Sequence, residues 1–259
     1  MNIDYEKTRA YWNNLNYDGQ YSVGYHMNNE LLALYRFKKE MNILKNNCSF
    51  GGRYLDLGCG AGNFLFEFSD YFESLIGIDF SEPLMEKAKS KCKNISKVEI
   101  YFDNIINFNK YLKDSILLNF IFVGGVFAYI EYADVKKIIN SLWGYLDEGG
   151  YLVLRELTAS RETMFLDEDG YVVHRRVKEE YVKLFLDKKY KRLKVINNYS
   201  VHYVTMIEKY QSLFIFFKKM PIDFWENRIV EFTLLFLPLI FIQRIKKNMY
   251  TYHFIIIEK

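Results

Sequence analysis

The sequence is poor in cysteine and has no strong charge of either sign. Its 259 residues include only three cysteines, which form no Cys-x-x-Cys pair: Cys48, Cys59 and Cys92. Such usage is typical of a reducing compartment, so we expect a cytoplasmic protein. The 35 basic and 32 acidic residues leave a formal net charge of +3. Because this balance gives little electrostatic attraction to nucleic acid, we expect no nucleic-acid partner.

Long apolar runs and metal-ligand patterns are also missing. The first residues contain no apolar signal segment, so we expect no secretion. The charge-free stretch 232–242 is too short to span a bilayer, and no stable membrane insertion is expected. We expect a core helix or a homodimer contact there, with a helix lying on a membrane surface as the alternative. The four histidines lack metal-ligand spacing, so no metal site is predicted.

One stretch, residues 54–64, predicts a ligand site. A short apolar strand leads into a turn with Gly58, Gly60 and Gly62, and a helix begins near Asn63. Glycines at this spacing allow positive φ and a close approach of a ligand to the main chain. The first N–H groups of the helix would point at that ligand. The alternative is a turn that only connects strand to helix.

The residue before this turn indicates which ligand is excluded. Asp56 lies two residues before Gly58, and its carboxylate would repel a pyrophosphate. The spacing also differs from the Gly-x-Gly-x-x-Gly of dinucleotide sites. The site therefore suits a ligand with positive or neutral groups, such as the amino group and sulfonium of S-adenosylmethionine.

Two more acids follow predicted strands. Asp79 ends the strand 75–79, at the distance where an acceptor for ribose hydroxyls is expected. Asp103 follows the strand 98–102, where it could accept from an adenine amine. Acids at the carboxyl ends of neighbouring parallel strands would face one crevice.

These motifs resemble those of class I S-adenosylmethionine-dependent methyltransferases. The first motif matches Asp56 and the three glycines, the second Asp79 with Phe80, and the third Asp103 with Asn104. The resemblance implies an enzyme with S-adenosylmethionine as cofactor. Its cofactor-binding residues would be Trp12, Asp56, Gly58, Cys59, Gly60, Gly62, Asp79, Phe80, Asp103, Asn104, Val123 and Gly124.

The resemblance also implies an α/β fold. We expect a Rossmann-like, seven-stranded, mostly parallel sheet flanked by helices, with a helical insertion before the last strand. One domain would cover residues 1–259: a helical segment 1–48, a cofactor-binding core 49–160, and acceptor-side insertions and last strands 161–259. The first segment would be either a lid over the cofactor or a helical layer packed on the sheet. Strands are expected at 53–57, 75–79, 98–102, 117–123, 151–156, 193–204 and 252–257, and helices near 5–12, 31–44, 64–70, 83–91, 133–146 and 179–187.

The acceptor side is less specific. After the fourth strand there is no Asn/Asp-Pro-Pro-Tyr, which argues against amino methylation of nucleobases, and no Pro-Cys, which excludes C5 methylation of cytosine. The catalytic candidates are His174, Tyr129 and Glu156, with His174 as either the base or a surface residue. Substrate-binding candidates are Tyr21, Tyr25, His26, Arg155, Arg175 and Arg176, of which the last two either clamp an anion or are solvated.

We therefore predict methylation of a small, anionic metabolite or surface-polysaccharide precursor at oxygen. A weaker similarity to protein α-N-terminal methyltransferases involves Tyr11-Trp12, Asp18-Gly19, Gly24-Tyr25 and His174-Arg175. The Asn and His with which that family reads a free amine are Leu157 and Tyr129 here. N-methylation of an amine or a protein N-terminus stays an alternative, and so does a non-catalytic cofactor-binding scaffold.

Overall fold

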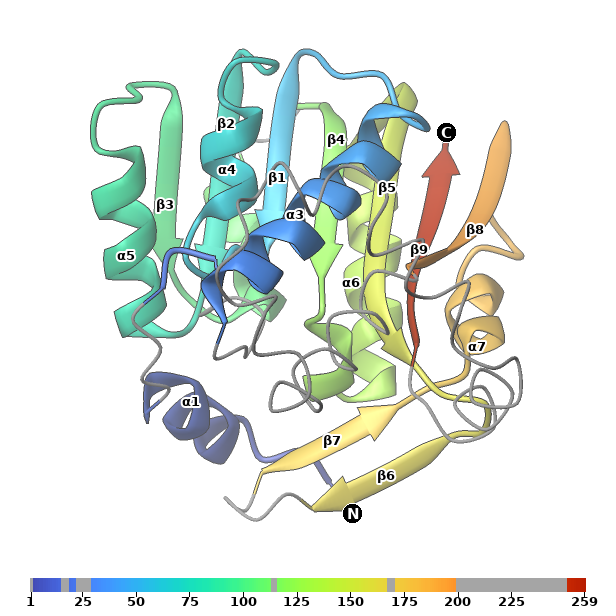
Figure 1. The fold of residues 1–259 in the computed structure, drawn as a ribbon. Coiled ribbons are helices and arrows are strands. Elements are labelled where there is room, and N and C mark those ends of the chain that lie inside the picture. The colour runs from blue at the N-terminus through green and yellow to red at the C-terminus, as the bar shows by residue number, and fades with distance from the viewer. Residues whose placement is uncertain (1, 15–18, 22–28, 113–115, 167–170, 199–250) are drawn as a thin grey trace, which may run out of the picture.

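A seven-stranded sheet forms the centre of the protein (Figure 1). The computed structural model describes residues 2–14, 19–21, 29–112, 116–166, 171–198 and 251–259. The strand order is β3-β2-β1-β4-β5-β9-β8. β1 to β5 are parallel, whereas β9 is antiparallel to both β5 and β8. Their bounds are β1 Arg53–Leu57, β2 Ser74–Asp79, β3 Val98–Phe102, β4 Leu118–Gly124, β5 Leu146–Thr158, β8 Arg192–Asn198 and β9 Thr251–Glu258. The predicted α/β fold with a seven-stranded, mostly parallel sheet is confirmed, whereas the helical insertion predicted before the last strand lies outside the described residues.

Helices cover both faces of this sheet. One layer contains α3 (Glu30–Lys45), α4 (Asn63–Phe68) and α5 (Glu82–Cys92), and the other contains η1 (Ile105–Tyr111), α6 (Tyr132–Tyr145) and α7 (Lys178–Lys183). Parallel strands buried on two faces are apolar at successive positions rather than at alternate ones. In β4, Phe120 and Phe122 pack toward α3 and α4, while Ile121 and Val123 pack toward α6.

Two further elements lie beyond the carboxyl ends of the parallel strands (Figure 1). One is α1, Tyr5–Asn14, and the other is a hairpin of β6, Thr163–Leu166, and β7, Val172–Arg175. The Tyr5 hydroxyl donates to Asp134 at 3.0 Å, and the Ser81 hydroxyl donates to the Trp12 carbonyl at 3.3 Å. These bonds attach α1 to two separate parts of the core.

Most element boundaries lie within a few residues of the prediction, but some places differ. The 3₁₀ helix η1 was not predicted, and α7 ends at Lys183 rather than at 187. β5 begins at Leu146 rather than at residue 151 and passes through Gly149 and Gly150; a register shift lies opposite, between Leu118 and Phe120. The β6–β7 hairpin was not predicted. β8 was predicted over 193–204, of which residues beyond 198 lie outside the described part, as does the stretch 232–242.

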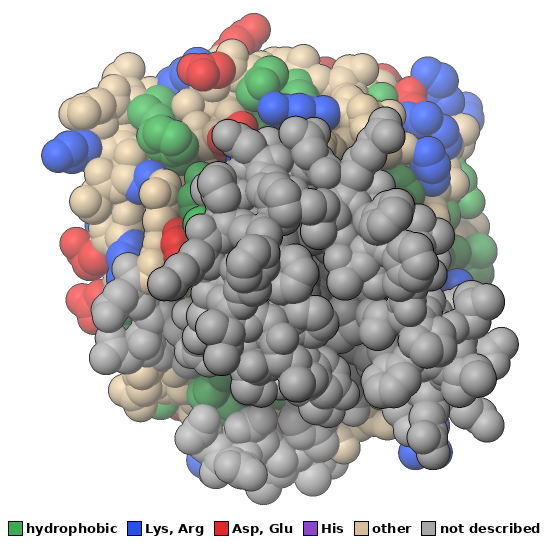
Figure 2. All heavy atoms as spheres, viewed as in Figure 1, with side chains coloured by type: hydrophobic (Ala, Val, Ile, Leu, Met, Phe, Trp, Pro, Cys, Tyr) green, Lys and Arg blue, Asp and Glu red, His purple; other side chains and the backbone are tan. Residues whose placement is uncertain are grey.

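The described surface mixes the two signs of charge. Basic and acidic side chains both lie along the margin of the face in Figure 2. In the described residues no helix is long and apolar enough to cross a membrane.

Candidate functional site

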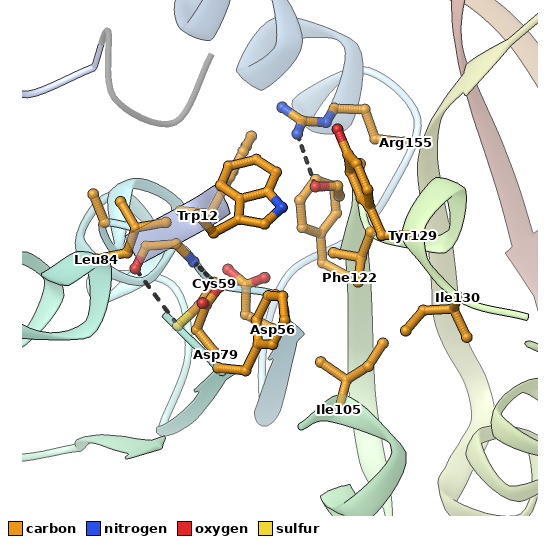
Figure 3. Close-up of a pocket in the computed structure, with 18 of the residues that line it drawn as sticks. Trp12, Asp56, Cys59, Asp79, Leu84, Ile105, Phe122, Tyr129, Ile130 and Arg155 are labelled. Atoms are coloured by element: carbon orange, nitrogen blue, oxygen red, sulfur yellow. Dashed lines mark hydrogen bonds between the residues drawn. The ribbon is translucent and has the colours of Figure 1, made fainter. Parts of the chain in front are cut away.

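A pocket of about 930 Å³, counted out to its open mouth, lies at the carboxyl ends of β1, β2, β4 and β5 (Figure 3). The structure brings together most of the predicted cofactor residues in its lining. These are Trp12, Asp56, Gly58, Cys59, Gly60, Asp79, Phe80, Asn104 and Gly124. The strand ends and the turn that follows β1 therefore form one concave site, as ligand sites of open α/β sheets do.

The glycine turn adopts the conformation that the sequence predicts. Gly58, Gly60 and Gly62 have φ of 78°, 53° and 73°, all in the left-handed region. A Cβ on Gly60 would meet nothing within 4 Å, and this residue lines the pocket. A Cβ on Gly62 would instead lie 2.9 Å from the Ala88 side chain. Gly60 thus leaves room for a ligand, whereas Gly62 does not line the pocket and allows α4 to pack against α5.

Asp56 is a buried acid at the end of β1. It is 2 % exposed, and the Tyr54 hydroxyl donates to its Oδ2 at 3.1 Å. Burial raises the pKa of Asp56 to about 7, although the Tyr54 hydrogen bond and the charge of Arg155 lower it; Asp79 raises it further. A cation bound beside this carboxyl would compensate its burial and favour the charged form.

Asp79 holds the glycine turn in place. Its Oδ2 accepts the N–H of Gly60 at 2.8 Å, and its Oδ1 accepts the N–H of Ser81 at 2.8 Å. Burial raises the pKa of Asp79, while these N–H groups lower it. Each carboxylate oxygen has more than one lone pair, so both oxygens keep capacity for a ligand hydroxyl.

The third predicted acid is displaced from the pocket. Asp103 accepts from Asn107 at 2.7 Å, Lys110 at 3.1 Å and Tyr111 at 2.9 Å, and it is absent from the lining. Burial would raise the pKa of Asp103, but these hydrogen bonds hold it at about 2. The geometry therefore does not support the prediction that Asp103 meets the ligand. Its neighbour Asn104 lines the pocket instead.

Apolar side chains complete this end of the site. Leu84 and Ile105 line it together with Phe80, and all three follow β2 or β3. Sequence reasoning missed Leu84 and Ile105. Their apolar character next to the second and third motifs was the available signal.

Arg155, at the end of β5, lines the opposite side of the pocket. Its Nη1 donates to Glu40 at 2.8 Å. Its Nη2 donates to the Gly124 carbonyl at 2.9 Å, the bond drawn in Figure 3. Glu40 is fully buried on α3 and also accepts from Arg36 at 3.0 Å and Asn198 at 2.7 Å. Arg155 is thus fixed by α3, and Glu40 offsets part of its charge.

Aromatic residues form the wall next to α1. Trp12 and Tyr129 meet edge to face with their ring centroids 5.5 Å apart, and both line the pocket. Tyr171 lies 3.9 Å from Tyr11 and 6.0 Å from Tyr129, again between centroids. The pKa of Tyr129 is raised, mainly by burial, and Arg175 lowers it. Burial likewise raises the pKa of Tyr5, another lining residue, to about 12.

His174 is not brought to the pocket. On β7 the side chains of Val173 and Arg175 share one face, and Val173 packs against Ala128 and Tyr129. His174 lies on the other face, where its Nε2 is 2.5 Å from Glu162. Burial and the charge of Arg176 lower the pKa of His174. Arg175, rather than His174, faces the pocket wall.

Three other candidates have structural contacts in place of the predicted ones. Glu156 is fully buried and accepts the N–H groups of Val126 and Phe127, each at 3.2 Å. Arg176 is fully buried and donates to backbone carbonyls, including that of Ile130 at 2.7 Å. Val123 packs into the core beside α6. None of the three lines the pocket, so the prediction of direct ligand contact does not agree with their placement.

The remaining candidates come from the segment before α3. Tyr21 packs on Phe37 with centroids 5.0 Å apart and its N–H donates to Glu30 at 2.8 Å, away from the pocket. Tyr25 and His26 lie outside the described residues. In the described residues no cluster of His, Cys, Asp and Glu is arranged to hold a metal.

A family model identifies the family of the chain. A family model described as a methyltransferase domain matches residues 49–183, which is more than half of the chain. A carboxy-S-adenosyl-L-methionine synthase of Nautilia profundicola is 28 % identical over 120 residues, which cover 45 % of this chain and 49 % of that protein. The chain thus matches about half the length of this curated relative.

Solved structures show the same fold at low identity. The DhpI–SAH complex has a TM-score of 0.55 and 13 % identity, covering 74 % of this chain and 90 % of that chain. A phosphoethanolamine N-methyltransferase 2 of Haemonchus contortus, in complex with phosphomonomethylethanolamine and S-adenosylhomocysteine, has a TM-score of 0.60 and 16 % identity. This match covers 86 % of this chain and 53 % of the Haemonchus contortus chain. The sheet, the turn after β1 and the family match together establish that the chain belongs to the methyltransferase domain family.

Proposed function

We propose that this methyltransferase takes S-adenosylmethionine as its methyl donor and methylates a small anionic acceptor at an oxygen that is already ionised. The observation that carries the proposal is Asp56, a buried carboxyl group in a pocket with apolar walls beside an open glycine turn. A pocket of this kind suits a ligand that is cationic at one end and apolar at the other.

The lining residues fit the donor in three parts. Asp56 would bind the α-amino group, because an ammonium compensates the buried carboxylate. Asp79 would accept from the ribose hydroxyls. Phe80, Leu84 and Ile105 would enclose the adenine, with Asn104 as a polar partner at its edge.

The acceptor class follows from which bases line the pocket. Among the described lining residues there is no His, Glu or Lys. The two carboxyl groups are assigned to the donor, and the Tyr5 and Tyr129 hydroxyls have raised pKa values, which makes them poor bases at neutral pH. An alcohol would need a base, whereas a carboxylate or phosphate-type oxygen does not.

Arg175 supports an anionic acceptor. It lies on the face of β7 that packs toward Tyr129, and its charge acts on the Tyr129 hydroxyl. A guanidinium in this place could bind an acid bidentately and orient it toward the pocket. A surface-polysaccharide precursor with an acidic group is one such compound.

The donor supplies an electrophilic methyl group on a sulfonium: the acceptor oxygen forms the new O–CH₃ bond while the C–S electron pair leaves with S-adenosylhomocysteine. The protein's residues align the two reactants and exclude water. Trp12 and Tyr129, which meet over the pocket, would desolvate the pair, and Arg175 would hold the acceptor.

An amine acceptor is the second candidate. A free amine needs no base either, and the rings of Trp12 and Tyr129 would stabilise the ammonium product. The Haemonchus phosphoethanolamine N-methyltransferase binds phosphomonomethylethanolamine, which pairs an amine with a phosphate. A compound of this type would also suit Arg175.

The test is incubation with methyl-labelled S-adenosylmethionine and a cell extract fractionated by size. We expect label in the small-molecule fraction, with the Asp56→Asn variant as the inactive control. Mild base would release labelled methanol from a carboxylate methyl ester, while N-methyl and phosphate methyl groups would survive and be separated by mass spectrometry. Label on protein would support N-terminal methylation, and cofactor binding without any labelled product would support the scaffold.

A further inference from the structure

The segment after β4 forms one wall of the pocket. Gly125, Val126, Tyr129 and Ile130 all line it. Between them, Phe127 is fully buried in the core beside α6. The segment is short and contains only a single 3₁₀ turn, η2 (Phe127–Tyr129), so its own backbone bonds do not determine its position.

A buried acid holds the N–H groups of this segment. Glu156 is fully buried near the end of β5, and its Oε1 accepts from Val126 and Phe127, each at 3.2 Å. Alternation along β5 places Glu156 on the face opposite to Arg155, which lines the pocket. Glu156 therefore contacts the wall from behind.

A buried arginine donates hydrogen bonds to the carbonyl groups of the same segment. Arg176 directly follows β7 and is fully buried, and its guanidinium donates to the carbonyls of Phe127 and Ile130. The N–H of Ala159 donates to the Arg176 carbonyl at 3.0 Å, which ties the end of β7 to the end of β5. The two charged side chains thus approach the wall from two different strands.

Phe127 links the two charges. Its N–H donates to Glu156 and its carbonyl accepts from Arg176. Burial raises the pKa of Glu156 to about 7, while the N–H groups of the segment and the charge of Arg176 favour its ionised form. Hydrogen bonds to ionised groups are roughly twice as strong as neutral ones, so each group depends on the compensation that the segment supplies. Removing either charge would leave the other with less compensation, so the two should act as a unit.

We propose that Glu156 and Arg176 are positioning residues that together clamp residues 125–130, and that this clamp sets the shape of the methyl-transfer pocket through the backbone of Phe127. Neither side chain lines the pocket. The clamp would operate whatever the acceptor is, because it holds the wall and not the ligand.

A double-mutant cycle on S-adenosylhomocysteine affinity tests this clamp. We expect Glu156→Gln and Arg176→Gln each to weaken binding by about tenfold by calorimetry. The double variant should lose about as much as either single one, because the same wall is released. Losses that multiply to about a hundredfold in the double variant, or single variants with unchanged affinity, would overturn the proposal.

Glu258→Gln is the matched control. Glu258 is also a buried acid of the sheet, but it binds Lys191 and Arg192 at the end of β9 that lies away from the pocket. It should change thermal stability without changing S-adenosylhomocysteine affinity. A similar affinity loss in this control would show a general effect of destabilisation and would contradict a local clamp.

Hydrogen exchange of the unaltered protein provides a test that needs no variant to fold. The Val126 and Phe127 amides should exchange as slowly as those of the central strands, although they lie in a loop. Exchange at the rate of exposed loops would overturn the clamp. Wild-type protein that binds no S-adenosylhomocysteine would contradict the proposed donor, while the exchange rates would still decide the clamp.

Discussion

Asp56 is a buried carboxyl group with a pKa of about 7, so ionising it in the folded protein costs free energy that the unfolded chain does not spend. Between the unfolded value near 3.8 and the folded value near 7, the folded state binds more protons than the unfolded state. The contribution of Asp56 to stability is therefore fully present at low pH and is lost as pH rises through 7.

Replacing this acid should separate stability from binding. We expect Asp56→Asn to raise the thermal midpoint of the ligand-free protein at pH 8, with a gap that shrinks toward pH 5, since asparagine does not ionise. The same variant should lose S-adenosylmethionine affinity, because its amide cannot pair with an ammonium. Thermal unfolding at both pH values, with and without ligand, measures this. If the gain in thermal midpoint of Asp56→Asn over wild type were smaller at pH 8 than at pH 5, the raised pKa of Asp56 would be contradicted.

Two glycines of the turn should respond differently to one methyl group. Gly62→Ala would place a Cβ 2.9 Å from Ala88, whereas at Gly60 the Cβ would meet nothing within 4 Å. Both variants should lose about 1–2 kcal/mol for the left-handed backbone. Gly62→Ala should lose about 1–3 kcal/mol more through overpacking. Urea unfolding measures the difference.

Ligand affinity gives the reverse ranking. Gly60→Ala should weaken S-adenosylhomocysteine binding more than its stability loss suggests, because its methyl group takes up space beside the pocket. Equal stability losses in the two variants, or unchanged affinity in Gly60→Ala, would contradict this account of the turn.

At the scale of elements, α1 covers one side of the pocket, and hydrogen bonds attach both ends of this helix to the core. Its Tyr5 hydroxyl donates to Asp134 at 3.0 Å and accepts the N–H of Glu131 at 3.3 Å, and its Trp12 carbonyl accepts from Ser81. Tyr5 and Trp12 also line the pocket. We therefore propose that the described part of the N-terminal segment excludes water from a bound ligand.

Tyr5→Phe should loosen the attachment of α1. The variant removes both hydroxyl bonds while keeping the ring, so we expect a stability loss of about 1 kcal/mol and faster hydrogen exchange in α1. Arg9→Gln is the control on the same helix, because Arg9 pairs with Glu6 on the exposed side and such pairs contribute little. Exchange in α1 that stays unchanged in Tyr5→Phe would show that the hydroxyl does not anchor it.

At the scale of the whole molecule, Glu40 joins three parts of the chain that are distant in sequence. It lies on α3 and accepts from Arg155 of β5 and Asn198 of β8, as well as from Arg36 on its own helix. All four side chains are buried. The helix α3, which precedes β1 in the chain, is thereby bound to β5 and to the edge strand β8.

Glu40→Ala should destabilise the protein by about 3–5 kcal/mol, because it leaves buried positive charge without its carboxylate. Urea unfolding measures this loss. Glu67→Ala is the control, since Glu67 pairs with Lys45 at 3.8 Å with both side chains more than a third exposed. Its loss should stay below about 1 kcal/mol. Equal stability losses in Glu40→Ala and Glu67→Ala would show that burial of the Glu40 network does not increase its contribution to stability.

Much of the core could be predicted because its signals are local. The glycine turn, the apolar strands and the acids at their ends are each a few residues long, and β1 and β3 have the predicted bounds. Asp56 and Asp79 were found because a strand end places its next side chain at the crevice. Asp103 was predicted by the same rule, and it does follow the end of β3. Its carboxylate, however, accepts hydrogen bonds from Asn107, Lys110 and Tyr111 of η1 and does not reach the pocket.

The acceptor side could not be predicted in this way. His174 and Arg175 are neighbours in sequence, yet alternation in β7 directs them to opposite faces, and the strand itself was not expected. Glu156 and Arg176 looked like groups for a substrate. They hold the backbone of the pocket wall, a role that depends on residues 29 to 49 positions away.

The sequence by itself determined the family, the strands and glycine turn of the nucleotide-type core, and the buried acid that we propose selects a cationic ligand. These depend on short motifs whose backbone geometry is the same wherever they occur. Only the tertiary structure decided which charged side chains reach the pocket and which are used to build it. Polar groups that leave water must find partners, and those partners come from strands and helices that meet only when the chain has folded.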